Sequence, residues 1–224
     1  MTARFRFLIS CAAVLSASAC IHNPDPETVR SDAGVTDFGA PDVPSSSTYD
    51  PILGMPVTGD LLLDDERVRN LDPSLLPQAD SACRSPVMVM IKYGLDGDTI
   101  VVDELGGDMT PSEHIRFIGV NSPEIAHGDM PEECYGPEAR DFTRALAGHV
   151  AWLSFGTSCM DIYGRTLAFL NFGTGNNDMY QHQLLRRGYA RVYTFSDNHT
   201  FATAFEADGA VAEADNVGLW AACR

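Results

Sequence analysis

The segment from Cys83 to the C-terminus restricts the possible folds most, because short apolar runs alternate there with turn residues. Runs of this length, bounded by Gly, Asp, Asn or Pro, are typical of β-strands. The five runs are Val87–Gly94, Asp98–Leu105, His114–Val120, Val150–Phe155 and Arg165–Phe172. Asp96-Gly97 between the first two predicts a hairpin, and Tyr189–Phe195 also has an extended pattern.

Three further segments carry helical signals. The first begins at Gly136-Pro137, where proline is tolerated in the first turn. The second ends at Gly188 and begins near Asp178, which has the spacing of a capping box with Gln181. The third covers Thr200–Asp215. Five strands and three helices with short connections predict an α+β domain, built as a five-stranded barrel with helices attached.

The N-terminus has the pattern of an export signal. Arg4 and Arg6 precede an apolar stretch, residues 7–17, that is too short to span a bilayer. The sequence Ala17-Ser18-Ala19 before Cys20 fits a cleavage site, and it also resembles a bacterial lipobox, in which the cysteine is acylated. We expect residues 1–19 to be a signal peptide and a lipid on Cys20 to anchor the exported protein to a membrane. Simple secretion is the alternative.

The next segment has the composition of a tether. Residues 21–80 contain eight prolines and twelve Asp or Glu against three Arg, and their hydrophobic periodicity is poor. Such a sequence buries too little apolar surface to offset the entropy lost on ordering. Within it, residues 64–76 could form a short helical turn. We therefore expect a disordered, acidic tether over residues 20–80 and one globular domain over residues 81–224.

Three short motifs in this domain carry residues suited to phosphate chemistry. Asp98 follows the hairpin turn, and Arg116 to Glu124 form an apolar strand that ends in a turn. The third motif is Tyr163-Gly164-Arg165, directly before a strand. Each motif alone has an ordinary structural explanation: an aspartate-rich turn, an edge strand with solvated charges at its ends, or an exposed arginine.

In this order, the three motifs together resemble the staphylococcal nuclease (thermonuclease) family. Supporting stretches are Glu133–Phe142, Leu184–Val192 and Asn216–Trp220, so the resemblance covers about residues 87–221. It implies that the barrel is an OB-fold and that the protein cleaves phosphodiester bonds in DNA and RNA with calcium as the cofactor.

The resemblance assigns catalytic and substrate-binding roles to several residues. Arg116 and Arg165 would bind the phosphate, and Glu124 would act as the general base. These types suit the reaction, because attack on a phosphodiester builds negative charge that guanidinium groups stabilise, while a carboxylate can take a proton from water. Tyr163 would lie beside the phosphate. Tyr193 is a candidate for stacking on a base, with core packing as the alternative.

The calcium ligands implied by the family are Asp98, Asn121 and the backbone carbonyl of Ser122. Calcium prefers oxygen ligands, and its affinity follows the charge of those ligands. The family usually carries aspartate at the position of Asn121. We therefore expect calcium to bind here, but more weakly than with a second carboxylate. The other reading is that Asn121 simply favours the turn.

The number of cysteines suits an oxidising compartment. If the signal peptide is removed and Cys20 is lipidated, four cysteines remain, enough for two disulfides. The family's fold implies that Cys134 and Cys159 both border the site. We therefore expect a Cys134–Cys159 disulfide, with Cys83–Cys223 joining the two ends of the domain.

The charge of the domain argues for a restricted substrate. Residues 81–224 contain 10 Lys or Arg and 19 Asp or Glu, a net charge of −9. An acidic surface weakens the attraction to polyphosphate, so we expect short or single-stranded nucleic acid as the substrate. We also expect a monomer. The same charge keeps open a non-catalytic oligonucleotide-binding barrel or a purely structural lipoprotein domain. The joint presence of Arg116, Glu124 and Arg165 favours the nuclease.

Overall fold

The structure is a computed structural model that describes residues 63–223 apart from 108, 110, 176–177 and 195–196, together with two short strands. These strands, β1 (Tyr49–Asp50) and β2 (Met55–Pro56), pair in antiparallel orientation. The predicted signal peptide, Cys20 and most of the predicted tether lie outside the described residues. Within the described part of the chain, no helix has the length and apolar character needed to cross a membrane.

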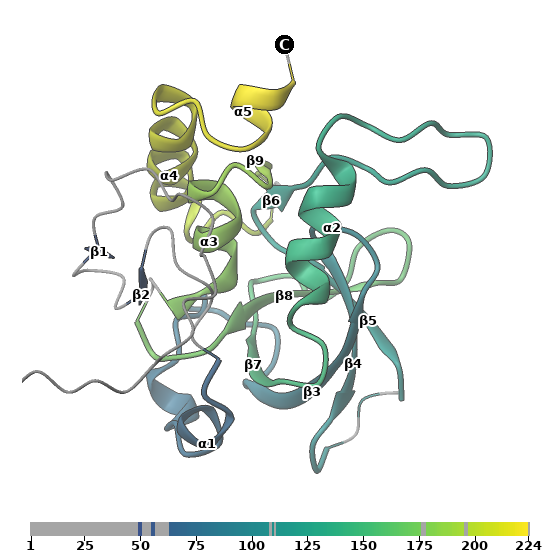
Figure 1. The fold of residues 1–224 in the computed structure, drawn as a ribbon. Coiled ribbons are helices and arrows are strands. Elements are labelled where there is room, and N and C mark those ends of the chain that lie inside the picture. Colours follow the sequence, from purple (N-terminus) through teal and green to yellow (C-terminus); the bar gives the residue numbers. More distant parts are fainter. Residues whose placement is uncertain are drawn as a thin grey trace, which may run out of the picture. The chain divides into compact units, whose positions relative to one another are not determined.

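A closed five-stranded barrel forms the centre of the domain (Figure 1). Its strands are β3 (Val87–Gly94), β4 (Thr99–Glu104), β5 (Glu113–Phe117), β7 (Val150–Ser154) and β8 (Thr166–Asn171). They pair in the order β3-β4-β5-β8-β7, and β7 pairs with β3 to close the barrel. All pairs are antiparallel except β5–β8, which is parallel. The five predicted strands are thereby confirmed.

Helices surround the barrel. The three predicted ones are α2 (Gly136–Arg144), α3 (Tyr180–Arg186) and α4 (Ala202–Ala214), and a short α5 (Leu219–Ala222) follows them. Helix α2 packs on β3, α3 packs on β8, and α4 packs on α3 (Figure 1). The predicted α+β architecture is therefore confirmed.

The folded domain begins earlier in the sequence than composition predicted. Helix α1 (Asp65–Arg69) and a 3-10 turn, η1 (Pro73–Leu75), precede the barrel, and α1 packs on β7. Val68 and Leu76 belong to the hydrophobic core, and the Asp65 carboxylate accepts a hydrogen bond from the backbone N–H of Val150 at 3.1 Å. The boundary predicted at residue 81 is therefore corrected, because two buried apolar side chains join residues 63–80 to the barrel.

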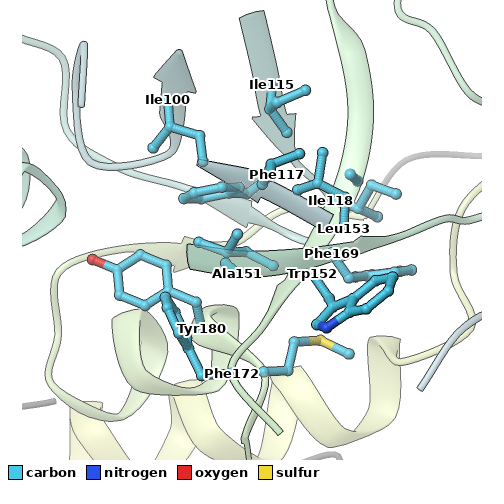
Figure 2. Packing of buried hydrophobic residues seen from close by; sticks show 14 of the residues in the cluster. Ile100, Ile115, Phe117, Ile118, Ala151, Trp152, Leu153, Phe169, Phe172 and Tyr180 are labelled. Atoms are coloured by element: carbon cyan, nitrogen blue, oxygen red, sulfur yellow. The ribbon is translucent and has the colours of Figure 1, made fainter. Parts of the chain in front are cut away.

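The core connects the barrel to the helices. Figure 2 shows Phe117 and Phe169 of the barrel together with Tyr180 of α3 and the nearby Phe172. The rings of Phe117 and Tyr180 meet edge to face, with centroids 5.6 Å apart. The Tyr180 hydroxyl lies 3.0 Å from Oγ1 of Thr143, which donates to the carbonyl oxygen of Gly97 at 2.7 Å. The turn before Asp98 is thus fixed by both α2 and α3.

Two local predictions differ from the structure. The strand predicted over His114–Val120 divides at Gly119, which has a φ of +86°. A Cβ atom at this position would lie 2.2 Å from the ring of Phe205. The chain continues as β6 (Val120–Asn121), which pairs with β9 (Arg191–Val192) outside the barrel. This short β9 is the strand that forms within the extended pattern predicted from Tyr189 onward.

The predicted capping box of α3 is also absent. Met179 occupies the N-cap position, and its side chain makes no capping hydrogen bond. Gln181 is instead buried against β8, where it accepts from the N–H of Leu170 and donates to the carbonyl oxygen of Ala168. The carboxamide therefore joins the helix to the barrel.

The predicted disulfide pairing is wrong. The structure joins Cys83 to Cys159 and Cys134 to Cys223. Cys83 lies close to Cys159 because the N–H of Cys83 donates to the carbonyl oxygen of Gly156, in the segment just before Cys159, at 2.9 Å. Cys159 lies between Ser158 and Met160, which line one pocket, whereas Cys134 lines a separate, smaller cavity with Ser122 and Pro123.

Candidate active site

A pocket of about 580 Å³ collects most of the predicted site residues. This volume is within the range of small-molecule sites. Six of the eight predicted residues line the pocket: Arg116, Asn121, Glu124, Tyr163, Arg165 and Tyr193. The other two, Asp98 and Ser122, are buried and bonded to each other, with the N–H of Ser122 donating to Asp98 Oδ2 at 2.6 Å. The structure therefore brings all eight together.

Arg116 is held rigidly at the base of this arrangement. It belongs to β5, and its side chain is only 6% exposed. Its Nη1 atom donates to the carbonyl oxygens of Phe117 and Val120, both at 2.7 Å. Its Nε atom lies 3.1 Å from Asp98 Oδ1, and its Nη2 atom donates to Asn121 Oδ1 at 3.0 Å. The guanidinium is thus fixed in one orientation by the strand that carries it and by the turn that follows.

Glu124 stands at the end of that turn. Its side chain is exposed overall, but partial burial of its carboxyl raises the pKa of Glu124, and the nearby Asp98 carboxylate raises it further. The guanidinium of Arg116 opposes this rise. A carboxylate with a raised pKa is a stronger base for taking a proton from water.

Arg165 reaches the pocket from a loop, directly before β8. Its Nε atom donates to Asp161 Oδ2 at 2.6 Å. Asp161 Oδ1 accepts the N–H groups of Tyr163 and Arg165, both at 2.9 Å. The guanidinium carbon lies 5.6 Å from the centroid of the Tyr163 ring. One carboxylate, Asp161, therefore shapes the loop and orients the arginine.

The mouth of the pocket is rich in exposed apolar side chains. Tyr163 is 78% exposed and Tyr193 49% exposed, and the pocket also includes Met160 and Ile162. The exposure of Tyr193 argues against the alternative that it packs in the core.

Comparison with known proteins agrees with this geometry. Residues 114–222 match the family described as staphylococcal nuclease homologue. The chain is 31% identical to the thermonuclease of Staphylococcus intermedius over 132 residues, which is 58% of this chain and 74% of that protein. It is 33% identical to the thermonuclease of Staphylococcus hyicus over 127 residues, or 56% and 71% of the two chains. The chain belongs to the staphylococcal nuclease family.

The five-stranded barrel is accordingly the OB-fold of the staphylococcal nuclease family, as the motifs predicted. Nucleases of this family act on phosphodiester bonds, and the pocket holds side chains suited to that reaction.

Several carboxylates lie close together beside the pocket, where the family's calcium ligands are expected. Burial raises the pKa of Asp96 to about 7, and the carboxylates of Asp98 and Glu124 contribute to the rise. Asp98 also raises the pKa of Glu124. Three carboxylates therefore repel one another beside the pocket, and a divalent cation would relieve that repulsion.

The donor atoms also suit calcium. Among the residues that the structure describes, no three His, Cys, Asp or Glu side chains group as a metal site. The ligand set expected from the family requires only one carboxylate, Asp98, with an amide oxygen from Asn121 and a backbone carbonyl from Ser122. Carboxylate and amide oxygens carry further lone pairs beside the hydrogen bonds they already accept. The residues present fit this cation.

Sequence reasoning missed three residues that support the site. Glu133 and Asp161 bond to the backbone of the two loops that carry Glu124 and Arg165. Asn198 is buried, and its carboxamide bonds to both backbone groups of Ser158 in the pocket wall. The signal for Asp161 was its position four residues before Arg165. Glu133 and Asn198 gave no comparable signal.

Proposed function

We propose that this chain is a calcium-dependent nuclease that hydrolyses phosphodiester bonds of DNA or RNA. The observation that carries the proposal is a single pocket holding two guanidinium groups, from Arg116 and Arg165, and the carboxylate of Glu124. The similarity to two thermonucleases supports the same conclusion.

Each side chain has a separate task in this mechanism. Glu124 takes a proton from the attacking water, which gives the water the character of hydroxide as it approaches phosphorus. Arg116 and Arg165 donate hydrogen bonds to the non-bridging oxygens, whose negative charge grows as the new P–O bond forms. The bond to the leaving oxygen then breaks. Tyr163 packs near Arg165, and Tyr193 offers an aromatic face for a base.

Asp98, Asn121 and the carbonyl of Ser122 would hold the calcium ion. Bound there, calcium supplies positive charge that stabilises the developing phosphate charge. Asp98 also contacts Arg116 Nε. The same carboxylate would therefore align the cation and one of the two arginines.

The substrate and location are also part of the proposal. The domain's net charge of −9 favours short or single-stranded substrates, and we expect a monomer. A lipid on Cys20 would anchor the exported protein to a membrane, and simple secretion is the alternative. Substitution Cys20→Ser should move the protein out of the membrane fraction, and unchanged fractionation would favour secretion.

A cleavage assay tests the function. The purified protein should degrade plasmid and a labelled oligonucleotide with calcium and stop on addition of chelator. Glu124→Gln keeps the shape of the side chain, so it should retain oligonucleotide binding while cleavage falls by ~10²–10⁴-fold. Cleavage by Glu124→Gln at the parent rate would make the base assignment wrong. A parent protein that shifts the oligonucleotide on a gel without cutting it would support the non-catalytic binding barrel instead.

A further inference from the structure

Glu133 holds the backbone of Glu124 through two hydrogen bonds. The N–H of Glu124 donates to Glu133 Oε2 at 3.0 Å, and the N–H of Glu133 donates to the carbonyl oxygen of Glu124 at 2.9 Å. Glu124 lies beyond the end of β6 (Val120–Asn121), so no strand holds it. Its backbone position therefore depends on a residue nine positions later in the sequence.

Gly136, at the start of α2, contacts both Glu133 and the backbone of Glu124. The N–H of Gly136 donates to the carbonyl oxygen of Glu133 at 3.0 Å. A Cβ atom on Gly136 would lie 2.4 Å from the carbonyl oxygen of Glu124. The backbones of Glu124 and Gly136 thus approach as closely as glycine allows. Any shift of the segment between residues 133 and 136 would move Glu124 with it.

A disulfide fixes this segment to the C-terminal end of the domain. Cys134 bonds to Cys223, 89 residues later, which follows helix α5. Helix α5 is itself tied to the body of the domain, because the N–H of Leu219 donates to the carbonyl oxygen of Gly188 at 2.9 Å. Glu133 and Cys134 are both exposed, so burial does little to hold them. The covalent bond supplies the restraint that burial does not.

A second, smaller cavity of about 180 Å³ lies between this disulfide and the turn that precedes Glu124. Its lining includes Ser122, Pro123, Glu133 and both cysteines. The turn before Glu124 is therefore not fully packed, because it borders this cavity, and the disulfide and Glu133 form other parts of the cavity wall.

We propose that Glu133 and the Cys134–Cys223 disulfide form a positioning clamp for Glu124, so that turnover by this nuclease depends on that disulfide. The proposal rests on the proposed role of Glu124 as the base. A carboxylate oxygen that accepts a backbone N–H makes a stronger hydrogen bond than a neutral acceptor does. Proton transfer requires the base within hydrogen-bond reach of the water. A misplacement of about 1 Å can cost on the order of 10²-fold in rate.

Steady-state kinetics on a fluorogenic single-stranded oligonucleotide test the clamp. Glu133→Ala should lower kcat by about tenfold and leave KM nearly unchanged, because the arginines still bind the phosphate. Glu133→Gln should recover most of the kcat, since its amide oxygen can accept the same N–H. Glu132→Ala, at the exposed neighbouring residue, serves as the matched control and should behave as the parent.

The disulfide is tested by the double variant Cys134→Ser/Cys223→Ser, assayed well below its unfolding temperature. It should lose kcat to a similar extent as Glu133→Ala, and combining the two changes should add little, because both release the same segment. Parent-like kcat in Glu133→Ala and in the cysteine variant, with Glu124→Gln inactive, would overturn the clamp and leave the base assignment intact. A rise in KM at unchanged kcat would also overturn it. A fully active Glu124→Gln would remove the proposed function on which the clamp rests.

Discussion

The two halves of the site are built in different ways. Arg116 belongs to barrel strand β5 and Asp98 directly precedes β4, and the two side chains are 6% and 4% exposed. Glu124 and Arg165 stand on loops at the edge of the pocket, and the Arg165 side chain is 32% exposed. The barrel half is ordered by the sheet and by burial. The loop half needs other restraints.

Those restraints repeat in both loops. In each one, a carboxylate accepts backbone N–H donors: Glu133 accepts the N–H of Glu124, and Asp161 accepts those of Tyr163 and Arg165. In each one, a disulfide cysteine lies within two residues of that carboxylate, at Cys134 and at Cys159. A site that must admit a polymer cannot bury all of its groups. Here local hydrogen bonds and covalent bonds take the place of burial.

The two arginines give the sharpest test of this comparison. Arg116→Ala leaves the buried Asp98 carboxylate without its ion-pair partner, so the free energy of unfolding should fall by ~3–5 kcal/mol. Arg165→Ala breaks an ion pair whose arginine is 32% exposed, and Asp161 keeps the N–H groups of residues 163 and 165 as partners, so the loss should stay below ~1 kcal/mol. Both variants should cleave very slowly. Urea unfolding followed by tryptophan fluorescence measures the difference, and equal losses of stability would remove the distinction between the two halves.

Removing the Cys83–Cys159 disulfide tests the restraint on the Arg165 loop. The bond spans 76 residues of sequence. Its removal in Cys83→Ser/Cys159→Ser should lower the free energy of unfolding by ~2–4 kcal/mol, mainly by freeing the unfolded chain. Hydrogen exchange should also accelerate over residues 157–165, because the loop loses its anchor. Exchange unchanged in this loop would mean that Asp161 alone is sufficient.

A smaller effect is expected from Asn121→Asp, at the boundary between the two halves. A carboxylate brings a full charge to the metal site in place of an amide dipole, and calcium affinity follows ligand charge. Calcium should then bind about tenfold more tightly, equivalent to roughly 1.4 kcal/mol. Calorimetry and a calcium titration of cleavage measure this. Unchanged midpoints in both would show that residue 121 is not a ligand.

The smallest effect concerns Asp161 and pH. Burial alone would raise the pKa of Asp161, but hydrogen bonds from Arg165 and from the N–H of Tyr163 together lower it below its usual value of 3.8. The charged form therefore stabilises the fold at neutral pH, and this contribution disappears as the pH falls below 3.8 through the folded-state value.

Asp161→Asn should accordingly cost less than ~1 kcal/mol at pH 7. Its unfolding temperature should approach that of the parent in acid. Asp129→Asn, at an exposed carboxylate of another loop, is the control and should show no such convergence. A constant difference between parent and Asp161→Asn at all pH values would mean that the charge of Asp161 is not involved.

The barrel half could be predicted from the sequence because its signals are local. Alternation and apolar runs locate the strands, and Asp98 and Arg116 each lie in a short motif of fixed spacing. The register of the sheet then brings them together without further information. Even the early helix near residue 65 was visible as a pattern, although its acidic surroundings hid its attachment to the barrel through Val68.

Glu124 and Arg165 of the loop half also lie in recognisable motifs, but the restraints that hold them could not be predicted, because those restraints join distant segments. The partner of Cys159 is decided by the path of residues 79–83 along Phe155 and Gly156, which no local pattern encodes. Glu133 is one acid among several in its loop, and only the folded chain places it against Glu124. Gln181 likewise had the spacing of a cap, but burial against β8 gave it another partner.

The two disulfides interleave along the chain: Cys134 lies inside the loop closed by Cys83 and Cys159, and Cys159 lies inside the loop closed by Cys134 and Cys223. A single cut anywhere between Cys83 and Cys223 therefore leaves both fragments covalently joined. The exposed turn around Met130, in the loop that follows Glu124, is an accessible place for a protease to make such a cut. A molecule nicked there would keep Glu133 attached to Cys223 and Arg165 attached to Cys83. The two disulfides therefore do not prevent cleavage by a protease, but they keep the cleaved chain together as one covalent molecule.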